Sequence, residues 1–116
     1  MKEKAFDTLN NPKGKLICVD MDGTLCEGEY WHVGGEADPL PNQEMIDIVN
    51  DLYIRGGHII IWTARTPDAY AFTQNWAIKH GVKHHGISMQ RKSGADLYID
   101  DKCLNVDDVI KNSFPQ

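Results

Sequence analysis

Short apolar runs rich in β-branched residues alternate along the chain with longer stretches in which apolar residues recur every three or four positions. The short runs predict buried strands, because the strands of a parallel sheet are covered on both faces. They lie at 15–20, 58–63 and 96–100, and a weaker strand is expected within 86–89. The three-and-four spacing predicts amphipathic helices whose apolar positions face the core. These helices are expected at about 42–55, 67–80 and 105–112, with Met45, Ile48, Leu52, Phe72 and Trp76 in the core.

Strands that alternate with helices indicate an α/β fold, because parallel neighbours need a crossover connection that a helix usually supplies. The pattern predicts a three-layer α/β/α, Rossmann-like parallel sheet with helices on both faces. At 116 residues the chain has the commonest size of one domain, so a single domain over 1–116 is expected. Residues 1–14 are expected to form a polar lead-in, and residues 26–40 a flap-like loop of unusual length.

Polar side chains gather where the predicted strands end. The first strand ends in Asp20-Met21-Asp22-Gly23-Thr24, the second in Thr63 and the last in Asp100-Asp101, while Lys92 precedes the last strand. The ligand crevice of an open parallel sheet lies beyond the carboxyl ends of its strands, so these segments are expected to converge on one edge. Residues two apart in an extended chain lie about 7 Å apart on the same side, so Asp20 and Asp22 can address one substrate atom.

Such a cluster of carboxylates needs a cation, because like charges disfavour joint ionisation. Magnesium suits the site, since it takes one or two carboxylates, water and a substrate phosphate rather than a full protein cage. An aspartate can attack phosphorus, provided that a second group protonates the leaving oxygen and later activates water. Asp20 and Asp22 fit those two roles. Thr63 and Lys92 are of the right types to stabilise the phosphoryl oxygens.

The ordered set of Asp20-Met21-Asp22-Gly23-Thr24-Leu25, Thr63, Lys92 and Ile99-Asp100-Asp101 resembles the four motifs of the haloacid dehalogenase (HAD) superfamily of phosphohydrolases. The likeness extends from Lys15 to about Asp108. Trp62-Thr63-Ala64-Arg65 and residues 96–102 resemble small members associated with bacterial capsule or surface-sugar biosynthesis. The resemblance implies a HAD-like fold and a magnesium-dependent phosphatase, because true dehalogenases of the superfamily lack the second aspartate.

The same resemblance assigns roles to single residues. Asp20 would be the nucleophile, Asp22 the general acid and base, and Thr63 and Lys92 the phosphate-binding residues. Magnesium would be held by the Asp20 side chain, the Asp22 main-chain carbonyl and Asp100, with Asp101 as a further ligand or an outer partner. Members of the superfamily usually carry a cap domain, but the intervals 22–42 and 63–92 are too short for one. We therefore expect a capless site that is open, or covered by the 26–40 loop or by a neighbouring subunit of a homo-oligomer.

The roles of some side chains near this edge have two interpretations. Arg65 can contact substrate or pair with a neighbouring carboxylate. Tyr30, Trp31 and His32 can form a substrate-facing flap or an apolar plug over the sheet. The five histidines suggest zinc, but neither a helical His-x-x-x-His with a glutamate nor a Cys and His pairing occurs, so surface positions are expected for them.

Charge and composition narrow the partners and the location. Twelve basic and 17 acidic residues give a net charge of −5, which disfavours nucleic acids and anionic membranes as main partners. A small-molecule phosphate ester, such as a sugar phosphate or a nucleotide, is the expected substrate. The chain has no apolar stretch of membrane-spanning length and no signal-peptide core near its start, so a cytoplasmic location is expected. The three cysteines lack C-x-x-C spacing, which favours packing roles.

Two other functions fit part of the pattern. A phosphoaccepting signal receiver also combines a parallel sheet, magnesium, a threonine and a lysine, but it carries its acidic pair on the first strand and its lysine last. Here the Asp100-Asp101 pair comes last, and Asp22 supplies a hydrolytic group. A catalytically silent domain that binds phosphate or magnesium would keep the fold without turnover, and the intact motifs disfavour it.

Overall fold

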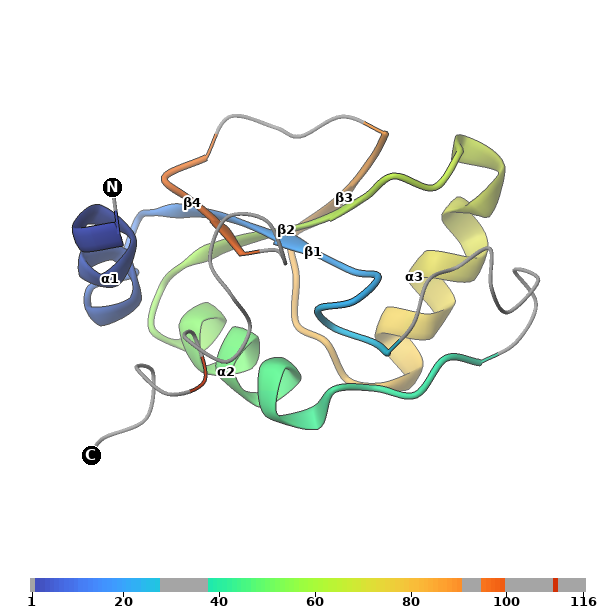
Figure 1. Ribbon diagram of the computed structural model, residues 1–116, viewed down its shortest axis with the longest axis horizontal. Coiled ribbons are helices and arrows are strands. Elements are labelled where there is room, and N and C mark those ends of the chain that lie inside the picture. The colour runs from blue at the N-terminus through green and yellow to red at the C-terminus, as the bar shows by residue number, and fades with distance from the viewer. Residues whose placement is uncertain (1, 28–37, 91–94, 100–109, 111–116) are drawn as a thin grey trace.

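The computed structural model describes residues 2–27, 38–90, 95–99 and 110 (Figure 1). Its centre is a four-stranded parallel sheet in the order β3-β2-β1-β4. The strands are β1 (Leu16–Asp20), β2 (His58–Thr63), β3 (Gly86–Met89) and β4 (Leu97–Ile99). The helices are α1 (Lys2–Asn10), α2 (Gln43–Ile54) and α3 (Tyr70–Lys79), and a 3-10 turn over Pro67–Ala69 leads into α3. The α/β class with a parallel sheet is confirmed, and the arrangement is consistent with a Rossmann-like three-layer architecture.

The strand register aligns the carboxyl ends of the central strands at one edge. Asp20, the last residue of β1, lies beside Trp62, which directly precedes Thr63. On the other side of β1, Val19 lies beside Ile99, the last residue of β4. The register therefore brings the ends of β1, β2 and β4 to the same edge, as the sequence predicted for the candidate site.

The core lies between the sheet and two crossover helices. Both crossovers step in the same direction across the sheet, so their right-handedness places α2 and α3 on one face, as Figure 1 shows. Fully buried side chains of alternate strand positions pack there against both helices. They include Ile17, Val19, Ile59, Ile61 and Ile99 from the sheet, and Met45, Val49, Leu52, Trp76 and Ala77 from the helices. Burying each large aliphatic side chain contributes about 1.5–3 kcal/mol.

The ends of α2 follow from local chemistry. Asn42 caps its start, where the side-chain oxygen accepts a hydrogen bond from the Met45 amide at 3.2 Å. Gly56 ends the helix with φ of 97°, a conformation that other residues rarely adopt. Gly57 follows where any Cβ would lie 2.9 Å from the Leu52 carbonyl oxygen. The predicted end of this helix near residue 55 is thus confirmed.

Residues 2–10 form a helix where the sequence predicted only a polar lead-in. Its described apolar contacts are few: Leu9 is buried in the core and Phe6 packs against it. Arg55, at the end of α2, donates hydrogen bonds to the Leu9 and Asn10 carbonyl oxygens at 3.0 and 3.3 Å. These carbonyls are the groups that a helix leaves unpaired at its C-terminus. The helix α1 is therefore completed by a residue distant in sequence, which local periodicity does not detect.

Two predicted segments lie largely outside the described residues. In the 26–40 loop, residues 28–37 are outside, whereas both ends of the loop are described. Of the predicted last helix only Ile110 is described, and it packs against the core. Among the described residues, no helix has the length and apolar character needed to cross a membrane.

Candidate active site

A tight turn after β1 places Asp22 at the carboxyl edge of the sheet. The Met21 carbonyl oxygen accepts hydrogen bonds from the amides of Thr24, Leu25 and Cys26 at 3.2, 2.9 and 3.2 Å. Gly23 has φ of 84°, a conformation that glycine adopts without steric cost. The side chains of Met21 and Leu25 are fully buried and anchor the turn in the core. As a result, the side chain of Asp22 is only partly exposed and faces the end of β2.

The Asp22 carboxylate accepts hydrogen bonds from three other side chains. Arg65 donates from Nη2 to Oδ1 at 2.8 Å and from Nε to Oδ2 at 3.1 Å. Thr63 Oγ1 lies 3.5 Å from Oδ2, and Cys26 Sγ lies 3.7 Å from Oδ1. A carboxylate offers about four lone-pair positions, and Arg65 and Thr63 engage three of them. The fourth faces the Cys26 thiol, whose single hydrogen can instead be donated to the Met21 carbonyl oxygen 3.5 Å away. The two guanidinium bonds form the short, bidentate part of this set.

Arg65 is held in a buried pocket behind Asp22. Its side chain has no exposed surface, while that of Asp22 is 13% exposed. Nη1 donates to Thr73 Oγ1 at 3.3 Å, and the guanidinium carbon lies 5.1 Å from the centre of the Phe72 ring. A buried guanidinium requires such partners, because its desolvation is costly. Of the two interpretations of Arg65, the structure shows the pair with a carboxylate.

Thr63 ends β2 and is fully buried in this arrangement. Its hydroxyl oxygen accepts a hydrogen bond from the Arg65 amide at 3.1 Å. The same hydroxyl contacts Asp22, the candidate acid–base residue. The Thr63 carbonyl oxygen accepts the Gln90 amide at 2.7 Å. Gln90 has φ of 63°, a conformation uncommon outside glycine, which places backbone strain just before the predicted phosphate-binding Lys92.

Oxygen atoms near Asp20 and Asp22 match the chemistry of a magnesium site in part. Among the described residues, none donates a hydrogen bond to the Asp22 main-chain carbonyl, the oxygen that the family resemblance assigns to the metal. Half-buried Asp20 supplies a second hard oxygen donor at the end of β1. Within the described ranges no three His, Cys, Asp or Glu residues gather closely enough to hold a metal. The other predicted ligands, Asp100 and Asp101, lie outside those ranges.

The structure thus brings together Asp22, Thr63 and Arg65, with Asp20 at the adjoining strand end. The remaining predicted site residues, Lys92, Asp100, Asp101, Tyr30, Trp31 and His32, lie outside the described residues. Sequence reasoning did not find the partners of this cluster: Cys26 was assigned to packing, Phe72 to the core, and Thr73 to no role. The sequence carried no periodic signal for Thr73, because Arg65 lies in a bend before α3 and Thr73 lies within that helix.

Cys26 is a neutral donor within this cluster. Burial raises the pKa of its thiol to about 12, and the negative charge of Asp22 acts in the same direction. The thiol therefore remains protonated at neutral pH and can donate toward Asp22. In the same turn, the buried Oγ1 of Thr24 has no hydrogen-bond partner among the described residues.

The two ends of the 26–40 loop meet beside the cluster. The Glu27 amide donates to the Leu40 carbonyl oxygen at 2.8 Å, next to a bridge between Cys26 and Pro41. We call this pairing the loop neck. The returning limb is attached to α3, because Trp76 Nε1 donates to the Pro39 carbonyl oxygen at 3.0 Å. Asp38 adds contacts to Lys79 and His80.

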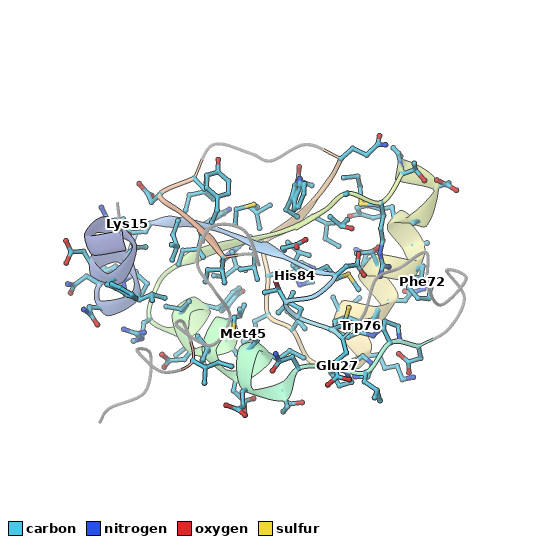
Figure 2. All side chains as sticks on the ribbon, viewed as in Figure 1. Lys15, Glu27, Met45, Phe72, Trp76 and His84 are labelled. Atoms are coloured by element: carbon cyan, nitrogen blue, oxygen red, sulfur yellow. The ribbon has the colours of Figure 1, made fainter. Side chains whose placement is uncertain are left out.

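A small cavity lies against the outer side of α3, where Figure 2 shows Phe72 and Trp76. It has a volume of about 180 Å³ and is lined by Asp38, Phe72, Asn75, Trp76 and Lys79. The Phe72 ring that lines it also contacts Arg65. The cavity therefore adjoins the buried partner of Asp22.

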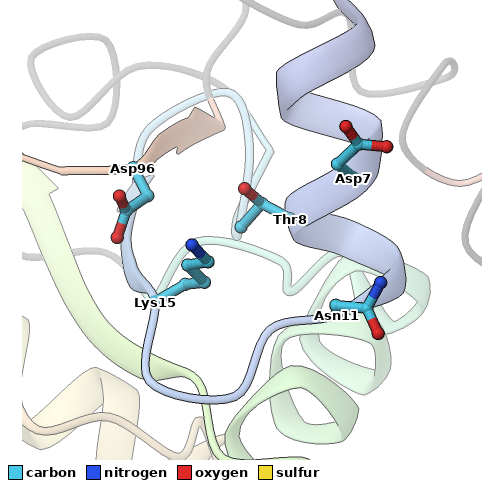
Figure 3. Close-up of a pocket in the computed structure, with 5 residues that line it drawn as sticks. All are labelled: Asp7, Thr8, Asn11, Lys15 and Asp96. Carbon is cyan, nitrogen blue, oxygen red and sulfur yellow. The ribbon is translucent and has the colours of Figure 1, made fainter.

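A larger concavity lies at the opposite end of the molecule. It has a volume of about 580 Å³ and is lined by Asp7, Thr8, Asn11, Lys15 and Asp96 (Figure 3). Lys15 precedes β1 and Asp96 precedes β4, so this space opens at the amino ends of the strands. Figure 2 shows Lys15 and Phe72 at opposite ends of the protein. None of the predicted site residues that the structure describes lines it.

The histidines of the described chain make no metal-binding group. His58 and His85 stack with ring centres 4.1 Å apart, and Tyr53 stacks on His85 at 4.5 Å. The Ile59 amide donates to His85 Nδ1 at 2.9 Å, so that nitrogen is an acceptor. His58 and His85 are exposed, as expected for surface positions, whereas His80 and His84 are half-buried.

The fold and the site together define a Rossmann-like α/β protein with a carboxylate–arginine cluster at the carboxyl edge of its sheet. A protein from Vibrio cholerae is similar in structure, with a TM-score of 0.59 and 25% identity over 83% of this chain and 87% of that one. A conserved protein from Bacteroides thetaiotaomicron has a TM-score of 0.64 and 20% identity over 87% and 93%. A hypothetical protein from Xanthomonas campestris has a TM-score of 0.50 and 25% identity over 78% and 46%.

No family model and no curated protein matches the chain. The printed descriptions of the three similar structures name no activity. The comparisons therefore support the shared fold, and function has to be argued from the site.

Proposed function

We propose that this protein is a HAD-type, magnesium-dependent phosphomonoesterase that forms an aspartyl-phosphate on Asp20. The observation that carries the proposal is the contact of Asp22 with Thr63 across two neighbouring strand ends, directly after Asp20. Nucleophile, acid–base group and hydroxyl donor are then adjacent at the edge where parallel sheets bind ligands. The proposed substrate is a small phosphate ester, either a sugar phosphate or a nucleotide.

The proposed reaction has two displacement steps at phosphorus. An Asp20 oxygen attacks phosphorus, the ester P–O bond breaks, and the leaving oxygen takes a proton from Asp22. Asp22 then accepts a proton from water, the water oxygen attacks phosphorus, and the bond to Asp20 breaks. Phosphate leaves and both carboxylates return to their starting states. Magnesium, held by the Asp20 side chain, the Asp22 carbonyl oxygen and the predicted ligand Asp100, would offset the repulsion between Asp20 and the phosphate dianion.

Thr63 and Lys92 are proposed to stabilise the phosphoryl oxygens. Charge spreads over the equatorial oxygens during transfer, so a hydroxyl donor and a fixed cation have their largest effect there. The Thr63 hydroxyl lies 3.5 Å from Asp22, a long hydrogen bond that can be exchanged for a shorter one to phosphate. Lys92 remains a prediction from the sequence.

A catalytically silent domain that binds phosphate or magnesium is the second candidate. The hydrogen bonds that the Asp22 carboxylate accepts from Arg65 and Thr63 favour it, because a general acid and base needs a free position for a proton. Turnover separates the two candidates, since a silent domain binds without releasing product.

The test is hydrolysis by the purified protein in the presence of magnesium. We expect repeated turnover of 4-nitrophenyl phosphate, its loss on removal of magnesium by EDTA, and a preference within a panel of sugar phosphates and nucleotides. Asp20→Asn protein, purified in the same way, measures contaminating phosphatase. A wild-type rate no higher than that of Asp20→Asn would overturn the proposal and favour the silent domain.

The setting of this activity is also proposed. A cytoplasmic location is part of the proposal. A homo-oligomer whose neighbouring subunit covers the site would replace the missing cap domain. The mass of the protein in solution, measured with and without substrate, tests the oligomer.

A further inference from the structure

We propose that Arg65 is a positioning residue: it holds the Asp22 carboxylate in one orientation from the buried side and does not touch substrate. The inference rests on the proposed function, because it assigns Asp22 a catalytic proton. It goes beyond the sequence expectation, in which Arg65 contacted either substrate or a carboxylate without a role in the reaction. The evidence is the geometry of the pair, the fixation of Arg65 and the unequal bonds around Asp22.

The pair fixes the plane of the carboxylate. Nη2 and Nε of Arg65 each contact a different oxygen of Asp22, at 2.8 and 3.1 Å. A guanidinium is planar and rigid, so two parallel bonds set both the distance and the rotation of the partner. A lysine can supply only one point of contact and leaves that rotation free. The arrangement therefore determines where the two lone-pair positions away from Arg65 are directed.

Arg65 itself is fixed from several directions. Thr73 Oγ1 accepts a hydrogen bond from Nη1, the third guanidinium nitrogen of Arg65, at 3.3 Å, and the Phe72 ring lies against the guanidinium. Its backbone amide donates to the Thr63 hydroxyl. The side chain has no exposed surface, so a substrate could reach it only after Asp22 had moved. Thr63 is buried to the same degree, so burial alone does not decide the role. Arg65 differs because all three of its guanidinium nitrogens already have partners, two bonds to Asp22 and one to Thr73.

The hydrogen bonds to the Asp22 carboxylate differ in length, and the long ones are those that a substrate can most easily replace. The two bonds to Arg65 have ordinary charge-assisted lengths, whereas Thr63 at 3.5 Å and Cys26 at 3.7 Å are distant donors. A substrate phosphate that takes the Thr63 hydroxyl would free one lone pair of Oδ2 without disturbing the guanidinium pair. Asp22 then gains a position for the catalytic proton while Arg65 keeps its orientation.

Two variants and two substrates test the role. Arg65→Lys keeps the charge and removes the planar fork, and Thr73→Val removes one bond that fixes Arg65 without touching Asp22. The substrates are 4-nitrophenyl phosphate, whose leaving group needs no proton, and glycerol phosphate, whose leaving group does. Arg55→Lys is the matched control, because it alters an arginine–aspartate pair on the surface. Thermal unfolding of each variant reports whether the fold is intact.

We expect Arg65→Lys to lower kcat on glycerol phosphate by about 100-fold, since general acid–base catalysis contributes roughly 10²–10⁴-fold. KM should change by less than about threefold, because binding contacts are retained. On 4-nitrophenyl phosphate the same variant should release one nitrophenolate per protein in a fast burst and then turn over slowly, since only the second step needs Asp22. Thr73→Val should show the same pattern with about a fivefold loss, and Arg55→Lys no change.

Other outcomes overturn the inference. A raised KM with unchanged kcat in Arg65→Lys would mean that Arg65 binds substrate. Equal losses on both substrates without a burst, in a folded variant, would mean that Arg65 affects the first step through some other route. If Arg65→Lys does not fold, an unchanged kcat in Thr73→Val is decisive against the role. A wild-type protein without turnover refutes the proposed function and this inference together, whereas an active wild type with an unaffected Arg65→Lys refutes the inference alone.

Discussion

Two arginine–aspartate pairs of this protein have nearly the same length and different surroundings. Arg65 Nη2 lies 2.8 Å from Asp22 Oδ1, and the two side chains are 0% and 13% exposed. Arg55 Nε lies 2.9 Å from Asp51 Oδ2, and those side chains are 37% and 57% exposed. Water can replace either partner of the surface pair, so such pairs contribute about 0–1 kcal/mol. Water cannot reach the buried guanidinium, so loss of its partner leaves an uncompensated charge.

The pairs also join different parts of the chain. Arg55 and Asp51 are one helical turn apart on α2, and Arg55 additionally binds carbonyl oxygens at the end of α1. Arg65 and Asp22 connect the turn after β1 with the segment after β2. The surface pair therefore supports local packing, whereas the buried pair sets the relative position of two strand ends. Distance alone would not distinguish these roles, and burial does.

The largest expected effect concerns the residue beside the buried pair. Asp20→Asn should abolish turnover, because the neutral amide is too weak a nucleophile to form the acyl phosphate, and it should leave the unfolding midpoint within a few degrees of wild type. Initial rates on 4-nitrophenyl phosphate and thermal unfolding measure both. Asp51→Asn, the same carboxylate-to-amide change at an exposed residue, should retain the parental rate. Parental turnover in Asp20→Asn would contradict the assignment of the nucleophile.

Removing each arginine should separate the pairs in stability. We expect Arg65→Gln to lower the free energy of unfolding by about 3–5 kcal/mol, as found when one partner of a buried ion pair is lost. Arg55→Gln should cost about 1 kcal/mol, which covers an exposed pair and its contacts to α1. Urea unfolding at one pH measures both values. Equal losses would show that burial does not decide the strength of these pairs.

A double-mutant cycle sharpens the same contrast. Removing both partners of the buried pair, in Asp22→Asn with Arg65→Gln, should be less destabilising than the sum of the single changes, with a coupling of about 2 kcal/mol. The cycle on Asp51 and Arg55 should give a coupling of about 0.5 kcal/mol or less. Urea unfolding of the six variants provides the energies. A buried coupling below that of the surface pair would argue against the uncompensated-charge explanation.

Cys26 offers a chemical probe of the buried cluster. Because the pKa of its thiol is raised to about 12, almost no thiolate exists at pH 8, and the sulfur is also shielded. We expect iodoacetamide to leave Cys26 unmodified in the folded protein and to modify it rapidly in urea. Peptide mass spectrometry identifies the labelled residue. Rapid labelling of Cys26 in the folded protein would show that the cluster opens readily.

The smallest expected effect concerns His85, an exposed residue at the amino end of the sheet. Desolvation, followed by the neighbouring charges of His58 and His84, lowers the pKa of His85 below 6.5. The unfolded chain then binds a proton at a higher pH than the folded protein, so stability falls as pH drops from above 6.5 through the lowered pKa. His85→Asn keeps an acceptor for the Ile59 amide and cannot titrate. Its urea midpoint should fall less than that of wild type between pH 7.5 and 5.5, and identical slopes would contradict the assignment.

Much of the sheet was predictable because its strands are short β-branched runs. The predicted ranges 58–63 and 86–89 coincide with β2 and β3, and 15–20 differs from β1 by one residue. Helix α1 was missed, since it has few apolar positions and is completed by Arg55. The buried side chains around Asp22 were missed for a related reason: Cys26 and Thr73 lie in a turn and on a helix whose relation to Asp22 exists only after the strands have paired.

The loop neck makes the segment between Glu27 and Leu40 a position where the chain can change in length. Its two ends are joined by the Glu27–Leu40 hydrogen bond and the Cys26–Pro41 bridge, so the sheet and the Asp22 turn close independently of what the segment contains. Lengthening a flexible segment between fixed ends costs only about 0.6 kcal/mol for each doubling. New sequences can therefore be inserted there by evolution or by design, while the Asp22–Arg65 pair keeps its place at the edge of the sheet.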